Sequence, residues 1–137
     1  MFQNPDDSVI REILAQSRTI AVVGCSPKEY RDSHAIARLL MRRGHKVIPV
    51  NPGHTEILGV KCYPDLLSIP EKVEMVDVFR RSEFVPDVAS QAIQIGAKIL
   101  WTQLGVWSEE AARKAQNAGM IVIMDRCPAI EYGRLRL

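Results

Sequence analysis

Five short runs of almost wholly apolar residues recur along the chain at intervals of about 23–28 positions. That interval is the length of a repeating β–α unit. Because the runs do not alternate with polar residues, they indicate strands buried on both faces, as in a parallel sheet covered by helices. The runs are Thr19–Gly24, Lys46–Val50, Glu74–Phe79, Ala97–Trp101 and Met120–Met124.

The segments between the runs carry apolar residues at helical spacing and end in glycine. They predict helices over Ser33–Gly44, over Val85–Gly96 and over Ser108–Gly119. A further helix, over about Asp6–Gln16, precedes the first run. The stretch Asn51–Pro70 is rich in turn-forming residues and leaves room only for a short extended segment.

Together these elements predict one Rossmann-like α/β domain over residues 1–137, a doubly wound, five-stranded parallel sheet of order 3-2-1-4-5 with helices on both faces. Ligands of such sheets bind at the carboxyl ends of the strands, where the strand order reverses. This order places the site beside strands 1 and 4 and makes the second strand internal. Since proline cannot donate to a sheet ladder, Pro49 then requires a bulge or an early strand end.

Composition limits the classes of function. Hydrophobic residues make up 47% of the 137 residues and charged residues 25%, as in a soluble domain. No apolar run approaches the roughly 18–20 residues of a membrane span, and the N-terminus lacks the features of a signal peptide, so we expect a cytoplasmic protein. A net charge of +2 gives no argument for nucleic acid. The three cysteines are scattered and form neither a disulfide framework nor a CxxC metal motif.

Local clustering of charge is more informative than the total. Four cations, Lys28, Arg31, Arg80 and Arg81, follow the first and third runs and should meet at the carboxyl edge of the sheet. A helix beginning near Ser33 adds free amides and the positive end of its dipole. Guanidinium groups bind phosphate in bidentate fashion, so this edge suits a polyphosphorylated ligand. The alternative is that these arginines are only solvated loop residues.

The loop after the first run narrows the choice of ligand. The P-loop motif is absent. Of the three glycines of a dinucleotide fingerprint only Gly24 is present, with Ser26 and Glu29 in the other places. The acid that would hold ribose hydroxyls after the second strand is replaced by Asn51. Such an acid would repel a phosphorylated ribose, so its absence fits coenzyme A or NADP. NADP sites usually keep the glycine-rich turn, and CoA is therefore favoured.

Several motifs together resemble the small stand-alone CoA-binding proteins, relatives of the CoA-binding domain of succinyl-CoA synthetase α subunits. They include "VVGCSPKEYRDSHAIARLLMRRGHKVIPVNP", "VDVFRRSE", "ILWTQLGVWSEEAARKAQNAGM" and "VIMDRCPAIE". The resemblance implies CoA bound along the carboxyl edge. It places phosphate contacts at Gly24, Ser26, Lys28, Arg31 and Ser33, and nucleotide or pantetheine contacts at Asn51, Pro52, Phe79, Arg80 and Arg81. Gln103 matches the pattern without a clear role.

The resemblance also limits the expected chemistry. The synthetase reaction needs a phosphorylated histidine in a second domain and a separate subunit, so we expect this chain to bind CoA or an acyl-CoA without catalysing a reaction alone, either as a binding protein or as a subunit that lends CoA to a partner enzyme. Two alternatives stay open: an NADP-linked or CoA-transferring enzyme subunit, and a regulatory module. In the second, Cys25, beside Lys28 and Arg31, would be a reactive thiol that forms a mixed disulfide with CoA. Structural packing of Cys25 is the competing interpretation.

Overall fold

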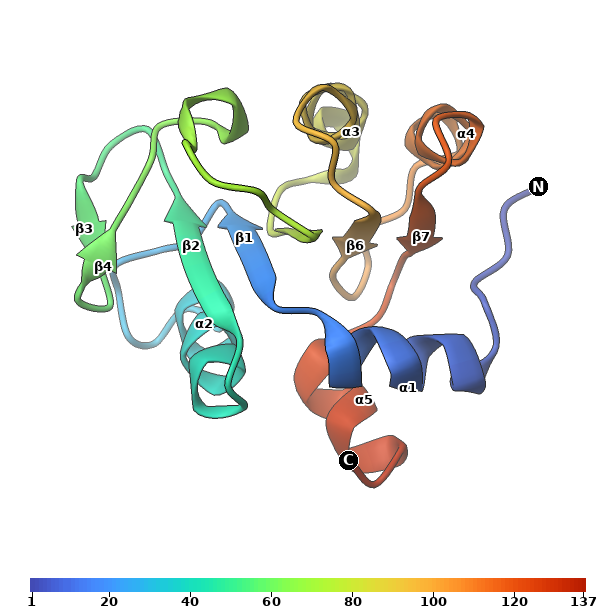
Figure 1. The fold of residues 1–137 in the computed structure, drawn as a ribbon, viewed down its shortest axis with the longest axis horizontal. Coiled ribbons are helices and arrows are strands. Elements are labelled where there is room, and N and C mark those ends of the chain that lie inside the picture. Colours follow the sequence, from blue (N-terminus) through green and yellow to red (C-terminus); the bar gives the residue numbers. More distant parts are fainter.

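A parallel sheet of five strands runs through the middle of the protein, with helices on both of its faces (Figure 1). The computed structural model describes residues 1–137. The sheet has the order β2-β1-β5-β6-β7. Its strands are β1 Thr19–Val23, β2 Lys46–Val50, β5 Met75–Val78, β6 Ile99–Thr102 and β7 Ile121–Ile123.

Five α-helices cover the sheet. One face carries α1 Asp7–Gln16, α2 Asp32–Arg42 and α5 Pro128–Arg134, and the other carries α3 Val85–Gln94 and α4 Glu109–Asn117 (Figure 1). A small antiparallel pair, β3 Glu56–Ile57 and β4 Val60–Lys61, lies beside β2, and short 3₁₀ turns occur at η1 Leu66–Ser68 and η2 Ser82–Phe84. No helix combines the length and apolar character that crossing a membrane requires.

The doubly wound fold predicted from the apolar runs is confirmed. The order 3-2-1-4-5 describes the sheet if the extended segment at Tyr63 takes the third place, since Tyr63 forms a single parallel bridge with Val50 on the outer side of β2. The run Glu74–Phe79 is then the fourth strand. It lies next to β1 and not beyond β2, which corrects the place expected for it and moves the point of strand reversal to β1 and β5.

Pro49 is accommodated because β2 is nearly an edge strand. The carbonyl of Pro49 accepts a hydrogen bond of 3.1 Å from the amide of Tyr63, on the side of β2 away from β1. The nitrogen of a strand residue faces the same side as its carbonyl, so the missing N–H of Pro49 also points outward. No hydrogen bond between β1 and β2 is lost, and the bulge expected here is unnecessary.

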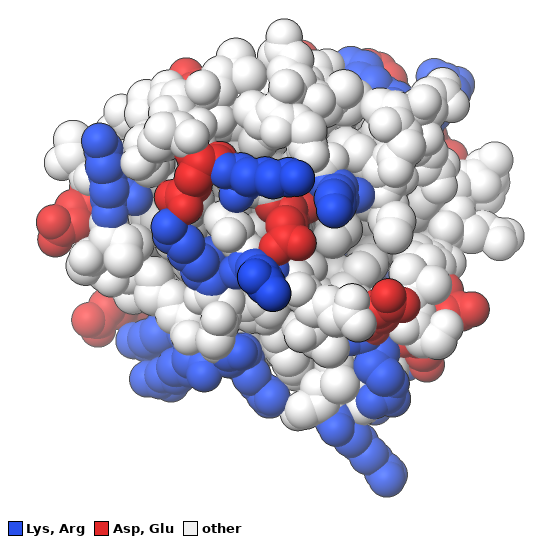
Figure 2. Space-filling model, viewed as in Figure 1, with Lys and Arg blue, Asp and Glu red and all other residues white.

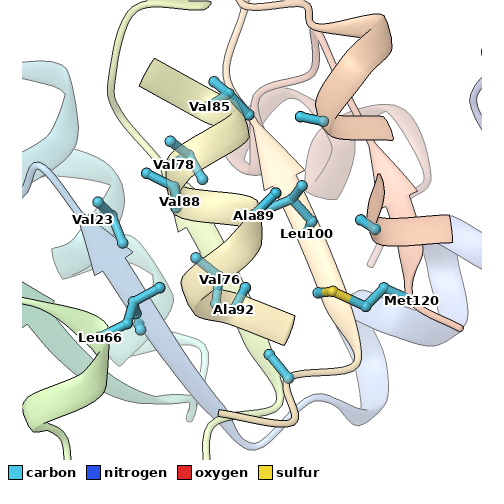
Figure 3. Close-up of a cluster of buried hydrophobic side chains, with 14 of the residues drawn as sticks. Val23, Leu66, Val76, Val78, Val85, Val88, Ala89, Ala92, Leu100 and Met120 are labelled. Atoms are coloured by element: carbon cyan, nitrogen blue, oxygen red, sulfur yellow. The ribbon is translucent and has the colours of Figure 1, made fainter. Parts of the chain in front are cut away.

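Two hydrophobic clusters, one on each face, hold the helices to the sheet. Figure 3 shows the first, in which Val76, Val78 and Leu100 of the sheet pack against α3. The second, on the opposite face, includes the fully buried Trp101, whose indole N–H donates to the carbonyl of Arg126 at 2.8 Å. Alternate residues of each strand thus pack into the clusters on opposite faces, so the strands are buried on both faces as the apolar runs predict.

Charges of both signs mix at the amino ends of the strands. Lys46, which begins β2, pairs with Glu71, and the carboxylate of Glu74 accepts from the backbone amide of Arg18 at 2.7 Å. Figure 2 likewise shows basic and acidic side chains next to one another on one face of the molecule. The edge of the sheet at the amino ends of the strands therefore has no electrostatic field of a single sign that would attract a charged ligand.

Candidate functional site

The candidate site lies at the carboxyl ends of β1 and β5. After β1 the chain turns into α2 on one face of the sheet, and after β5 it turns into α3 on the opposite face. The two connections diverge and leave a crevice between the strand ends, which is where open α/β sheets bind ligands.

Gly24 controls how closely the two strand ends approach. Its φ is +84°, a conformation that glycine adopts without strain. A Cβ atom at this position would lie 2.5 Å from the carbonyl oxygen of Phe79. Any side chain at Gly24 would therefore push the strand ends apart, so this glycine is required by both conformation and space.

The loop from Gly24 to α2 is held by its own hydrogen bonds. The amide of Ser26 donates to Oγ of Ser33 at 2.9 Å, and the amide of Lys28 donates to Oγ of Ser26 at 3.1 Å. The ring of His34 donates through Nδ1 to the carbonyl of Ser26 at 2.9 Å. Both serine hydroxyls act as acceptors within the loop, and each still has its own proton to donate to a ligand.

Asn51 ties this loop to the end of β2. Its side-chain amide donates to the carbonyl of Cys25 at 2.9 Å, and its Oδ1 accepts from the amide of Gly53 at the same distance. The position where a dinucleotide site would carry an acid thus holds a neutral side chain, which forms hydrogen bonds with the loops after β1 and β2.

Two clefts open from the crevice and meet at Gly24 and Arg80. The first cleft has a volume of about 570 Å³ and lies on the α2 side; it is lined by Gly24, Ser26, Tyr30, Arg31, Asp32, Ser33, Phe79, Arg80, Arg81, Gln103 and Val106. The second cleft, of about 460 Å³, lies on the α3 side. It is lined by Val23, Gly24, Val50, Asn51, Pro52, Pro64, Asp65, Leu66, Arg80, Phe84, Asp87, Val88 and Gln91.

Positive charge is concentrated where the clefts meet. The guanidinium of Arg80 lies over the ring of Phe84, 4.4 Å from its centroid, and forms no ion pair with a carboxylate. Arg81 has only a solvent-exposed pairing with Glu83 at 3.5 Å. Arg31 is the N-cap residue of α2 and leaves that helix without a side-chain cap. Uncapped amides and free guanidinium groups together form an anion-binding environment.

Most of the residues predicted from sequence lie in this arrangement. Those that line one or both clefts are Gly24, Ser26, Arg31, Ser33, Asn51, Pro52, Phe79, Arg80, Arg81 and Gln103. The side chain of Lys28 is exposed on the loop and lines neither cleft. The structure brings the predicted positions together, and their role as CoA contacts stays a prediction.

Cys25 contradicts the hypothesis of a reactive thiol. Its side chain is fully buried and lines neither cleft. Burial, with smaller contributions from Cys62 and Asp77, raises the pKa of the Cys25 thiol to about 12. A thiol in this state is a poor nucleophile, so the adjacent cations do not activate it and the packing interpretation is correct. A buried thiol that lines neither cleft is out of reach of the CoA sulfur, so the structure contradicts a mixed disulfide at Cys25.

Asp77 is a buried carboxyl directly behind the first cleft. It lies in the middle of β5 with no exposed surface, and one oxygen accepts a hydrogen bond from Nε2 of Gln103. Its Oδ2 has no partner. Burial raises the pKa of Asp77 to about 8, and the Gln103 hydrogen bond opposes that rise. Asp77 therefore fixes the orientation of a side chain that lines the cleft.

Sequence reasoning left several cleft residues without a site assignment. Tyr30, Asp32 and Val106 line the first cleft, and Phe84 and Leu66 line the second. Tyr30 and Asp32 could have been included because they lie within the same loop. Phe84 and Leu66 carry no motif, and only the packing of η1 and η2 beside β2 and β5 brings them to the crevice. Trp101 follows the same strand pattern, but it belongs to the core and lines neither cleft.

A doubly wound sheet with cation-lined clefts at its switch point has the architecture of the open α/β folds that bind nucleotides. A family model described as a CoA binding domain matches residues 18–133. The chain therefore belongs to the CoA-binding domain family.

Some relatives match this chain over nearly their whole length, and others are longer enzymes of which only a small part matches. An uncharacterized protein of Bacillus subtilis, YneT, is 42% identical over 131 residues, which cover 96% of this chain and 97% of that protein. The structure of a hypothetical protein from Pyrococcus horikoshii is 41% identical with a TM-score of 0.94, and the match covers 100% of this chain and 99% of that one. An ADP-forming acetate–CoA ligase of Archaeoglobus fulgidus is 33% identical over 101 residues, 72% of this chain and only 15% of the ligase.

Proposed function

We propose that this protein binds coenzyme A, free or acylated, across the two clefts at the carboxyl edge of the sheet. The observation that carries the proposal is that Arg80, a cation without an acidic partner, stands where both clefts meet in a chain of the CoA-binding domain family. CoA carries a diphosphate between two larger halves, and a charged junction between two clefts suits that shape.

Each part of the ligand has a fitting environment. The diphosphate would lie at Gly24, held by the uncapped amides of α2, the hydroxyls of Ser26 and Ser33, and Arg80. The adenosine half fits the second cleft, which combines apolar walls with Asn51 and Pro52. The pantetheine half fits the first cleft, along Phe79 and Gln103. Arg31 and Arg81 line the first cleft and would contact the diphosphate from that side, and Arg80 is the one cation that also lines the second cleft, where the ribose phosphate would lie.

We propose further that the chain binds its ligand without catalysing a reaction alone and presents it to a protein partner. The match covers only 15% of the acetate–CoA ligase, so the activity of the whole ligase is not carried over to this chain. Two of its three histidines have structural contacts: His34 with Ser26, and His45 with Ser17 and Tyr132.

Replacing Arg80 should weaken CoA binding selectively. We expect Arg80→Ala to reduce the binding free energy by about 1–3 kcal/mol, because a charge-assisted hydrogen bond to phosphate is lost. Isothermal titration calorimetry measures the change. Arg42→Ala is the matched control, since Arg42 is exposed at the far end of α2 and should leave affinity unchanged. Equal affinity in both variants would remove Arg80 from the site.

The choice between CoA and NADP is tested in the same protein. A ligand at 100 times its Kd adds about 2.7 kcal/mol of stability, which a thermal shift detects readily. We expect a shift with CoA and a smaller one with dephospho-CoA, which lacks the ribose phosphate. A shift with NADP but none with CoA would overturn the proposed function.

A further inference from the structure

A third cleft opens beside the first on the α2 side, toward α5. Its volume is about 300 Å³, and it is lined by Asp32, Ala35, Ile36, Phe79, Gln103, Leu104 and Cys127. Three of these residues, Asp32, Phe79 and Gln103, also line the first cleft. The second, first and third clefts therefore follow one another along the carboxyl edge, with Arg80 at the junction of the first two and Arg31 and Arg81 in the first.

The third cleft differs in character from its neighbours. Apolar or weakly polar side chains form most of its wall, and it contains no lysine or arginine. Leu104 contributes an apolar side chain that is 57% exposed. The one carboxylate, Asp32, stands at the boundary with the first cleft. Such a surface gains from covering by an apolar group and gains nothing from a phosphate or a carboxylate.

We propose that the third cleft binds the acyl group of an acyl-CoA thioester and selects uncharged, apolar acyl groups. This inference rests on the proposed function, because it needs the CoA part to lie in the first two clefts. With the diphosphate at Gly24, the pantetheine runs past Phe79 and Gln103, and its sulfur end reaches the shared boundary. A group attached to that sulfur then enters the third cleft.

The size and charge of the cleft set its selectivity. A volume of about 300 Å³ holds several groups of the size of water, each of which occupies about 30 Å³. The cleft therefore has room for about ten such groups, and an acyl chain of four carbons fits with its methylenes against the apolar wall. A succinyl or malonyl group would instead bring a second carboxylate next to Asp32 and against apolar walls, with no cation to pair with it.

The affinities of CoA, acetyl-CoA, butyryl-CoA and succinyl-CoA, measured by calorimetry on the full chain, test the inference. Each fully buried methylene is worth about a fourfold gain in affinity. We expect butyryl-CoA to bind about tenfold tighter than acetyl-CoA, and succinyl-CoA to bind more weakly than butyryl-CoA by at least as much. If CoA binds but affinity is independent of the acyl group, the acyl site is refuted and the proposed function stands. If CoA does not bind, both fail.

A variant with a larger side chain in the third cleft tests whether the dependence of affinity on the acyl group arises there. Ala35 is exposed on α2 and lines the third cleft but not the first, so Ala35→Leu should fold and occupy part of the space along the wall where the acyl group would lie. We expect the ratio of butyryl-CoA to acetyl-CoA affinity to fall from about tenfold to about one. Ala15→Leu, at an exposed position of α1, is the matched control and should keep the wild-type ratio. An unchanged ratio in Ala35→Leu would place the acyl group elsewhere.

Discussion

Gly24→Ala should destabilise the protein and abolish CoA binding together. The new Cβ would lie 2.5 Å from the carbonyl oxygen of Phe79, and the backbone would hold alanine at a φ of +84°. Left-handed strain costs about 1–2 kcal/mol and overpacking about 1–3 kcal/mol, so we expect a total loss of roughly 2–5 kcal/mol in the free energy of unfolding. Urea denaturation measures it.

Gly96→Ala separates the two causes. Gly96, which follows α3, has a comparable φ of +75°, but no atom lies within 4 Å of a Cβ at its position. The free energy of unfolding of Gly96→Ala should therefore fall only by the strain contribution of about 1–2 kcal/mol, and this variant should keep wild-type affinity for CoA. Equal losses in the two variants would show that the close approach of β1 and β5 at Gly24 has no energetic consequence.

Asp77→Asn should make the protein more stable at neutral and mildly basic pH. The carboxyl of Asp77 is fully buried, its Oδ2 has no hydrogen-bond partner, and no cation pairs with it. At pH 8 and above the wild type must bury a carboxylate or unfold. Asparagine keeps the shape and an acceptor oxygen for Gln103 without a charge.

The sign of the pH dependence follows from the direction of the shift. Burial raises the pKa of Asp77 to about 8 in the folded protein from an ordinary value of 3.8 in the unfolded chain. Between these values the folded state binds more protons, so stability is highest at low pH and falls as pH rises, by at most about 1.4 kcal/mol per pH unit. The stability of Asp77→Asn relative to the wild type should therefore increase from pH 5 to pH 8.

Unfolding by urea at pH 5, 6, 7 and 8 tests this expectation. Asp87→Asn, which removes an exposed carboxyl on α3, is the control and should follow the wild-type pH profile. Parallel profiles for Asp77→Asn and the wild type would mean that Asp77 is ionised in the folded protein and stabilised by a contact that the structure does not contain.

Much of the site was accessible from sequence because its residues directly follow strands. The apolar runs locate the strand ends, and the carboxyl ends of parallel strands share one edge of the sheet. This reasoning brought Ser26, Arg31, Asn51 and Arg80 to one edge, and the structure confirms that they line adjoining clefts. Lys28 has the right place in the chain, but its side chain turns to solvent.

Other features depended on packing between distant segments. The reactivity of Cys25 looked plausible from its neighbours in the chain, yet burial, which is a property of the fold, decides its pKa. In the same way, Phe84 lies beneath Arg80 and Leu104 borders the third cleft, and the residues next to each of them in the chain do not indicate these positions.

The sequence by itself determined the class of fold, the edge of the sheet that carries the candidate site and the cationic character of that edge, because hydrophobic periodicity and strand ends are local properties of the chain. Only the tertiary structure decided which strand lies beside β1, that Gly24 is pressed against Phe79, that Asp77 lies buried behind Gln103, and that an apolar cleft continues from the cationic ones. These features arise from contacts between residues far apart in the chain, which no local pattern encodes.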